Sequence, residues 1–230
     1  MSAERPPDFE QLKEKLLLMA SQAESAVNRA VKALVRRDDD LALRTRDDDQ
    51  VIDRLEVEID DGAVQLLAGR PSMEELRRII MAMKIAHNLE RVGDEATTIS
   101  RRCLELSCEP QLRQAALIPR LAGMALQMLK DALDAFVHRD GGKARSVIPR
   151  DGEVDQIYRE LRCDLASSMH ERPSSISRCL NLMVVAKSLE RIADHAANIA
   201  EEVVYMLEGQ DIRHRRAAEL AGAPTAVIHS

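Results

Sequence analysis

Residues 89–94 read LERVGD, and residues 189–194 read LERIAD, the same pattern displaced by 100 positions. Residues 70–72 read RPS, and the same tripeptide recurs at residues 172–174, an offset of 102. Two aspartates, described below, recur at that same offset. Three independent matches at nearly one spacing predict that the chain holds two copies of one unit of about 100 residues each.

Composition and hydrophobic spacing predict that both copies are helical. Apolar residues make up 45% of the chain, whereas Gly and Pro number only nine and eight. Between Leu12 and Leu34 the apolar residues recur at steps of three and four, and no convincing stretch alternates with a period of two. Breaks near residues 36–40, 69–72, 108–110, 138–142, 171–174 and 209 divide the chain into six helices.

These features predict an all-α fold made of two tandem antiparallel three-helix bundles that are related by internal duplication. We expect the first repeat to span residues 8–108 and the second to span residues 111–209. Residues 210–230, which are rich in small side chains, are expected to form a partly disordered tail.

Charge and aromatic content exclude several classes of protein. With 33 basic and 39 acidic residues the net charge is −6, which argues against a nucleic-acid-binding protein. Two Phe, two Tyr and no Trp make a stacking platform for bases or sugars improbable on composition. No apolar run approaches the roughly 18 residues of a membrane span, and the N-terminus does not resemble a secretion signal. We therefore expect a cytoplasmic protein whose four cysteines are reduced thiols.

Each repeat carries two pairs of acids spaced four residues apart, so that both acids of a pair lie on one helix face. The pairs are Asp49 with Asp53, Glu90 with Asp94, Asp151 with Asp155, and Glu190 with Asp194. One such pair usually belongs to a solvated surface. These pairs recur at corresponding positions of both copies, which favours a functional role. The neighbouring acids Glu56 and Asp60 do not recur, because their counterparts are Tyr158 and Arg162.

Four carboxylates that converge from two helices either take up protons or recruit cations. Oxygen ligands suit hard cations such as Mg²⁺, Ca²⁺ or Mn²⁺, with iron also suitable and zinc less natural. A ferritin-like di-iron centre is disfavoured, because His87 precedes Glu90 in the order HxxE and its counterpart is Lys187. Two alternatives remain open: a metal store or metalloenzyme, and a helical scaffold whose acids only keep one face soluble.

The sequence contains no pattern typical of an enzyme. Nucleophile elbows, phosphate-binding glycine loops and HExxH motifs are missing from the printed sequence. His195 directly follows Asp194, where it would be either an outer metal ligand or a histidine satisfied at an interface. We therefore expect a protein that is not an enzyme and has no catalytic residues.

The two hexapeptides resemble the ERIGD-type signatures of the PhoU family of phosphate-transport regulators. Residues 49–56 and 151–158 resemble the aspartate-rich segments of that family, and residues 209–214, GQDIRH, are similar to the ending of its proteobacterial members. The likeness covers roughly residues 9–214.

This resemblance implies a fold of two three-helix bundles, a homodimer, and a location beside the inner membrane that is reached through partners only. It implies negative regulation of phosphate uptake and of the phosphate-starvation regulon. The implied partners are PstB, the ATPase subunit of the phosphate transporter, and the sensor histidine kinase PhoR. It further implies that the eight acids bind clusters of divalent or trivalent metal ions (Mg, Mn, Fe or Zn).

Two features of the sequence depart from the family pattern. Pro149 and Gly152 bracket Asp151 where a helix usually continues, and an internal proline costs about 3 kcal/mol unless it begins a new helix. We therefore expect a kink or a restart at this point. Ala193 replaces the usual glycine, and its methyl group is expected to limit how closely the two helices approach.

Overall fold

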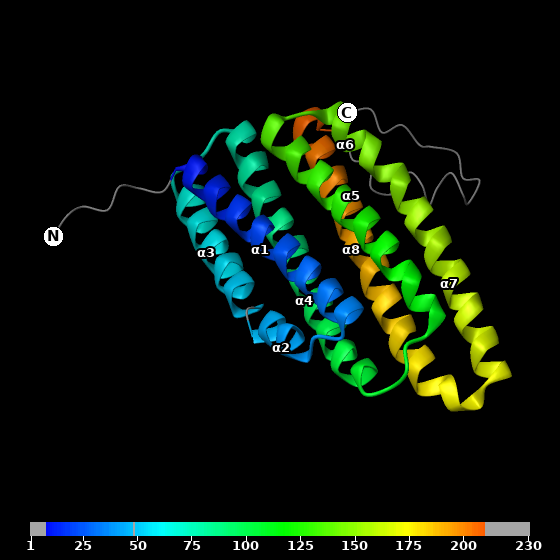
Figure 1. The fold of residues 1–230 in the computed structure, drawn as a ribbon. Coiled ribbons are helices and arrows are strands. Elements are labelled where there is room, and N and C mark those ends of the chain that lie inside the picture. The colour runs from blue at the N-terminus through cyan, green and yellow to red at the C-terminus, as the bar shows by residue number, and fades with distance from the viewer. Residues whose placement is uncertain (1–7, 48, 210–230) are drawn as a thin grey trace.

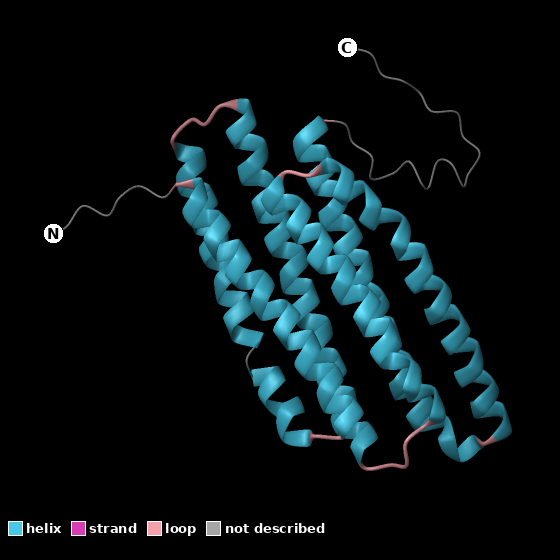
Figure 2. Cartoon of the chain, turned by 45° about the horizontal axis from the view of Figure 1, so that its top comes forward, coloured by secondary structure: helices cyan, strands magenta, loops and turns pink. Residues whose placement is uncertain are grey.

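A computed structural model describes residues 8–47 and 49–209, which form helices joined by short connections and contain no strand. The first repeat contains α1 (Phe9–Arg36), α2 (Asp39–Asp47), α3 (Asp49–Ala68) and α4 (Met73–Ser107). The second contains η1 (Arg113–Leu117), α5 (Ile118–His138), α6 (Gly141–Val147), η2 (Ile148–Arg150), α7 (Asp151–Glu171), η3 (Pro173–Ser175) and α8 (Ile176–Glu208). The long helices run side by side, with their connections at the two ends of the molecule (Figure 1, Figure 2). The predicted all-α fold of two three-helix bundles is confirmed.

Local capping explains several helix ends. Asp8 begins α1 by accepting a hydrogen bond from the backbone N–H of Gln11 at 2.9 Å. Ser72 and Glu75 form the expected capping box at the start of α4, in which each side chain accepts from the other residue's backbone N–H. At the far end of the fold Gly209, with a φ of 68°, takes the left-handed conformation that ends α8.

The middle helix of each bundle is divided, which the six-helix prediction missed. The charged segment after α1 forms the short helix α2 instead of a simple corner, and α6 occupies the equivalent place in the second repeat. The expected restart at Pro149 is present, because η2 contains this proline and α7 begins at Asp151. As a result, the long helices α3 and α7 both begin at the first aspartate of their acid pair.

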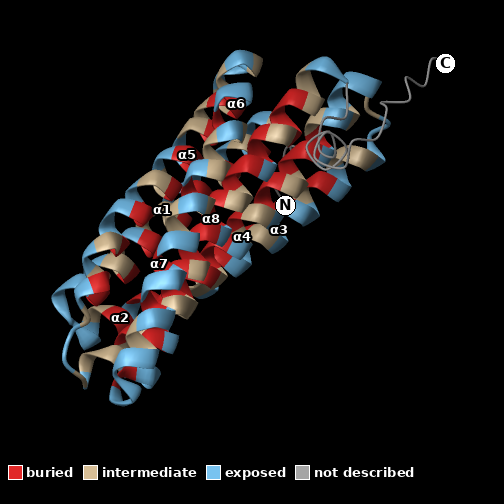
Figure 3. Ribbon diagram, turned by 90° about the vertical axis from the view of Figure 1, so that its right-hand side faces the viewer, coloured by how far each residue is buried: buried red, intermediate tan, exposed pale blue. Residues whose placement is uncertain are grey.

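The two bundles meet along α4 and α8, which lie antiparallel at the centre of the molecule (Figure 1). In the first bundle α1, α3 and α4 pack together, and α5, α7 and α8 do the same in the second. Buried residues follow the inward faces of the helices, while exposed residues cover the outside (Figure 3). The acid pairs of α4 and α8 are thus carried by the two most central helices.

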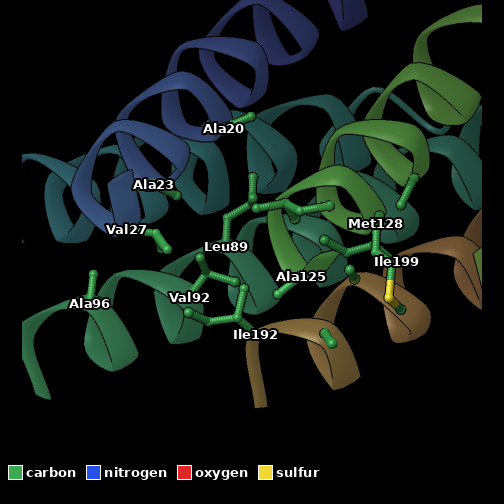
Figure 4. Packing of buried hydrophobic residues seen from close by; sticks show 14 of the residues in the cluster. Ala20, Ala23, Val27, Leu89, Val92, Ala96, Ala125, Met128, Ile192 and Ile199 are labelled. Atoms are coloured by element: carbon green, nitrogen blue, oxygen red, sulfur yellow. The ribbon is translucent and has the colours of Figure 1, made fainter. Parts of the chain in front are cut away.

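One hydrophobic core extends through both bundles. Leu89 and Val92 of α4 and Ile192 of α8 are fully buried and lie close together, with α1 and α5 packed around them (Figure 4). Many of the buried residues on α1 and α5 are alanines, for example Ala23 and Ala125, which allow helices to pack closely. The shared core makes α4 and α8 a rigid support for the polar side chains along them.

Within the two described ranges, every helix falls short of the length and apolar character needed to cross a membrane. The predicted C-terminal tail, residues 210–230, lies outside the described residues.

Candidate metal sites

The first-repeat site consists of Asp49 and Asp53 on α3 with Glu90 and Asp94 on α4. Gly93 determines how closely these helices approach, because a Cβ atom there would lie 2.9 Å from Ile52 Cδ1 and 3.1 Å from Asp49 Oδ1. The missing side chain therefore lets the Asp49 carboxylate reach the surface of α4, next to Asp94.

Two carboxylates of the first-repeat site, Asp49 and Glu90, have a raised pKa. Burial raises the pKa of Asp49, a hydrogen bond with Thr97 opposes this, and the charges of Asp53 and Asp94 add to it. The pKa of Glu90 is raised by burial and then by Asp94. Asp94 thus couples the Asp49 end of the site to the Glu90 end, and all four predicted acids belong to one electrostatic group.

Two residues outside the predicted set extend this site. Glu56, His87 and Glu90 each place a potential ligand atom within 4.8 Å of those of the other two. Glu56 Oε1 lies 3.3 Å from His87 Nδ1. The second repeat lacks both residues, and on sequence alone this argues against a role for them in metal binding. Their positions in the sequence could have indicated that they belong to the site. Glu56 lies on the same helix face as Asp49 and Asp53, and His87 lies one helical turn before Glu90.

Arg91 forms ion pairs with two carboxylates of the first-repeat site. Its Nε atom lies 3.0 Å from Glu90 Oε2, and its Nη1 atom donates to Asp94 Oδ2 at 2.9 Å. About half of the Arg91 side chain is exposed, so the guanidinium can turn away without disturbing the core. A cation that competes with Arg91 would therefore meet carboxylates already gathered in one place.

The second-repeat site consists of Asp151 and Asp155 on α7 with Glu190 and Asp194 on α8. Burial, the charges of Glu190 and Asp151, and a hydrogen bond with Asp151 raise the pKa of Asp194 to about 7. Burial also raises the pKa of Glu190, against the effect of Lys187, and Glu190 shares a hydrogen bond with Asp155. The acids of this repeat therefore form two hydrogen-bonded pairs, Asp151 with Asp194 and Asp155 with Glu190, and the charge of Glu190 acts on Asp194.

An ammonium group occupies the second-repeat site where the first has an imidazole. Lys187, the counterpart of His87, forms an ion pair with Glu190. Its Nζ atom also lies 5.5 Å from the ring centroid of Tyr158, which is the counterpart of Glu56. Burial disfavours the Lys187 charge, but its contact with Glu190 outweighs this, and its pKa is raised. The second-repeat site thus carries a built-in cation.

The inter-repeat cleft, with a volume of about 780 Å³, separates the two sites. Its walls come from α4 and α8, and Asp49, Asp94 and Asp194 face it. Arg191 crosses it to Glu95, with 3.1 Å between Nη1 and Oε1. His195 lies at this interface, where its Nδ1 is 3.0 Å from Asn88 Oδ1, and burial lowers its pKa to about 4. Of the two interpretations left open for His195, the structure favours the interface histidine.

The donor sets fit metal ions, and they fit different ones. Carboxylates alone suit Mg²⁺ or Mn²⁺, whereas an imidazole among carboxylates favours transition ions such as Mn²⁺, Fe²⁺ or Zn²⁺. In the first-repeat site Glu56, Glu90 and His87 provide such a mixed set on two rigid helices. In the second-repeat site the Lys187 ammonium must leave Glu190 before a metal ion can use that carboxylate.

Comparison with known proteins identifies one family. The family model described as "PhoU domain" matches the chain twice, at residues 16–103 and 118–203. A PhoU homolog of Pseudomonas putida, named a phosphate-specific transport system accessory protein, is 40% identical over 225 residues, which cover 95% of this chain and 88% of that protein. The homolog in Pseudomonas aeruginosa is 41% identical over 209 residues, covering 90% and 86% of the two chains.

Solved structures agree with the sequence comparison. The crystal structure of PhoU from P. aeruginosa matches with a TM-score of 0.85 and 39% identity, covering 87% of this chain and 97% of that one. The phosphate transport system regulatory protein PhoU from Streptococcus pneumoniae matches with a TM-score of 0.82 and 28% identity, covering 88% and 96%.

Proposed function

The chain belongs to the PhoU family, and we propose on this basis that it is an accessory and regulatory protein of a phosphate transport system. In this role it lowers phosphate uptake and represses the phosphate-starvation genes when phosphate is plentiful. It acts as a cytoplasmic homodimer and as an adaptor, without catalysis of its own. Its partners are PstB, the ATPase subunit of the transporter, and the sensor kinase PhoR, both of which follow from the resemblance at residues 89–94 and 189–194.

The observation that supports the adaptor role most directly is the pair of acid groups held at equivalent places of the two repeats. In each repeat four carboxylates lie at one helix pair, and two of them, Asp49 and Glu90 in the first and Glu190 and Asp194 in the second, have a raised pKa. We propose that Asp49, Asp53, Glu90 and Asp94 hold metal ions in the first repeat, joined by Glu56 and His87. Asp151, Asp155, Glu190 and Asp194 would hold them in the second.

Bound metal ions would supply positive charge to a surface that is otherwise acidic. The chain's own residues then have separate tasks: α3 and α7 hold one half of each acid group, and α4 and α8 hold the other half. A surface that changes its charge with metal occupancy can discriminate between acidic and basic partner surfaces. This gives the proposed adaptor a docking face whose charge depends on ligand occupancy.

The test is a complementation experiment in a strain of the source organism that lacks this gene, with a phosphate-starvation reporter. Variants E90Q/D94N and E190Q/D194N neutralise one pair in each repeat. D60N/D61N neutralises two exposed acids of α3 outside the site as a matched control. At high phosphate we expect the control to restore repression and at least one site variant to lose both repression and bound metal.

Full repression by a variant that folds but binds no metal would contradict the metal-dependent adaptor. Failure of the wild-type gene to restore repression would contradict the regulatory role itself. Metal content is measured on the purified variants by elemental analysis, and helicity by circular dichroism. Binding of only a few metal ions per chain would distinguish the adaptor function from metal storage, which requires many ions per chain.

A further inference from the structure

We propose that the inter-repeat cleft binds inorganic phosphate, as the hydrogen phosphate ion, between side chains of α4 and α8. The inference rests on the proposed function, because it names the small molecule through which a phosphate regulator would sense its signal. It assigns a ligand to the cleft itself, separately from the acid groups on either side.

Guanidinium groups from both repeats supply the donors. Arg91 and Arg101 of α4 and Arg191 of α8 line the cleft. Arg101 is exposed, and its charge acts on Asp49 without a direct ion pair within the described part of the chain. Arg191 is 54% exposed and uses one of its nitrogens to contact Glu95, so further N–H groups remain for a ligand. Planar guanidinium groups match tetrahedral oxyanions through paired hydrogen bonds.

Neutral donors complete the polar lining. The Thr98 hydroxyl and the Asn198 amide belong to the wall of the cleft, one from each central helix. His195 lies in the same wall, where its Nδ1 atom is 3.0 Å from Asn88 Oδ1. The cleft therefore offers charged and uncharged hydrogen-bond donors on both sides of a single opening, as a multi-oxygen anion requires.

Glu95 supplies a reason for phosphate in particular. Its Oε1 atom accepts from Arg191, while its Oε2 atom has no hydrogen-bond partner among the described residues. A carboxylate next to an anion normally repels it, but hydrogen phosphate still carries a proton that a carboxylate can accept. Sulfate carries no such proton at neutral pH. A small rotation of Glu95 toward the cleft would thus favour phosphate over sulfate, an ion of the same shape.

The acids of the flanking sites link phosphate binding to metal binding. Asp49, Asp94 and Asp194 face the cleft, and their charges oppose an incoming anion. When metal ions neutralise them, the charges of the three arginines dominate. Metal should therefore strengthen phosphate binding, and phosphate must strengthen metal binding by the same factor.

The experiment measures binding of radiolabelled inorganic phosphate by equilibrium dialysis against the full chain, with Mn²⁺ and with a chelator. The variants are R101A, R191A and E95Q, and the matched control is R120A, which removes an exposed arginine of α5 outside the cleft. We expect R101A and R191A each to weaken phosphate binding about tenfold or more, and R120A to leave it unchanged. E95Q should reduce the preference for phosphate over sulfate.

Three results would overturn the proposal. The first is the absence of phosphate binding to the folded wild-type chain, and the second is binding that R101A and R191A leave unchanged, as expected for phosphate held by metal alone. The third is O-phosphoserine binding tenfold tighter than inorganic phosphate, which would assign the cleft to a phosphorylated partner. Equal phosphate binding with Mn²⁺ and with chelator would contradict the coupling, while the direct metal measurements decide the proposed function separately.

Discussion

The two repeats place the same four acids on the same helices, yet surround them with different neighbours. In the first repeat Glu56 and His87 accompany the acids, and both offer electron pairs to a cation. In the second repeat Tyr158 and Lys187 occupy those positions, and Lys187 brings a positive charge of its own. Both repeats therefore keep the four carboxylates. In the second repeat the Lys187 ammonium competes with a metal ion for Glu190, whereas in the first His87 can itself bind the ion. We expect the first-repeat site to bind transition-metal ions more tightly than the second.

The largest expected effect is the loss of the first-repeat site alone. Variant E90Q/D94N removes both α4 carboxylates, and we expect Mn²⁺ affinity there to fall about 100-fold or more, because loss of supporting outer residues alone typically costs 10–100-fold. The equivalent variant E190Q/D194N should remove only the weaker class of sites. Isothermal titration of both variants measures this order, and a larger loss of affinity from E190Q/D194N would reverse the comparison.

Exchanging the residues beside the acids between the two repeats tests whether these residues cause the expected difference in metal affinity. We expect H87K to weaken the first-repeat site about 10–100-fold, because the ammonium would compete for Glu90. Conversely, Y158E/K187H should convert the second-repeat site into an imidazole-containing one with raised affinity for Mn²⁺ or Zn²⁺. Electron paramagnetic resonance of the Mn²⁺-loaded variants checks the ligand change. If affinities stay unchanged in both exchanges, the neighbours do not set the difference.

A smaller effect is expected from the glycine that lets α3 approach α4. A methyl group at position 93 would lie 2.9 Å from Ile52 Cδ1, so overpacking should cost G93A about 1–3 kcal/mol, of which the higher helix propensity of alanine offsets about 1 kcal/mol. At the equivalent position Ala193 is already accommodated and fully buried. There A193G should cost about 1 kcal/mol because glycine is a poorer helix former. Urea unfolding measures both, and a stabilising G93A would contradict the close approach.

The pH dependence of the chelated protein tests one carboxylate of the second-repeat site. The pKa of Asp194 rises from 3.8 to about 7 on folding. The native state therefore binds more protons than the unfolded state between these values, and this contribution to stability is full below about pH 3.8 and lost as pH rises through 7. We expect D194N to flatten the fall in stability between pH 5 and about 7.5. Thermal unfolding in chelator measures this, and equal slopes would contradict the raised pKa.

How far the sequence predicts the structure depends on how local each feature is. Ser72 and Glu75 predict the start of α4, and Pro149 predicts the restart before α7, because capping and proline geometry involve only a few neighbouring residues. The helix α2 was missed, since its charged sequence carries no apolar stripe of the length that marks the other helices. Spacing on single helices plus the duplication predicts that the eight acids gather in two groups, and this stays a prediction, because the group of three close ligand atoms found among the described residues, Glu56, His87 and Glu90, contains one of the eight.

The composition of each site could not be predicted in the same way. Whether Glu56 reaches His87 depends on the register between α3 and α4, which spacing along one helix does not define. On sequence alone, the replacement of His87 by Lys187 in the second repeat argues against a metal-binding role for this position. In the structure Lys187 forms an ion pair with Glu190, whereas His87 offers a ligand atom beside Glu90. The arginines of the inter-repeat cleft were also missed, because a net charge of −6 averages over surfaces of opposite sign.

The most direct test of the account is anomalous X-ray diffraction at the manganese edge from crystals of the full chain soaked in Mn²⁺. We predict a strong peak among Glu56, His87 and Glu90 and a weaker one among Asp151, Glu190 and Asp194. Crystals that diffract well but show no anomalous peak at either acid group, or a stronger peak beside Lys187, would contradict it.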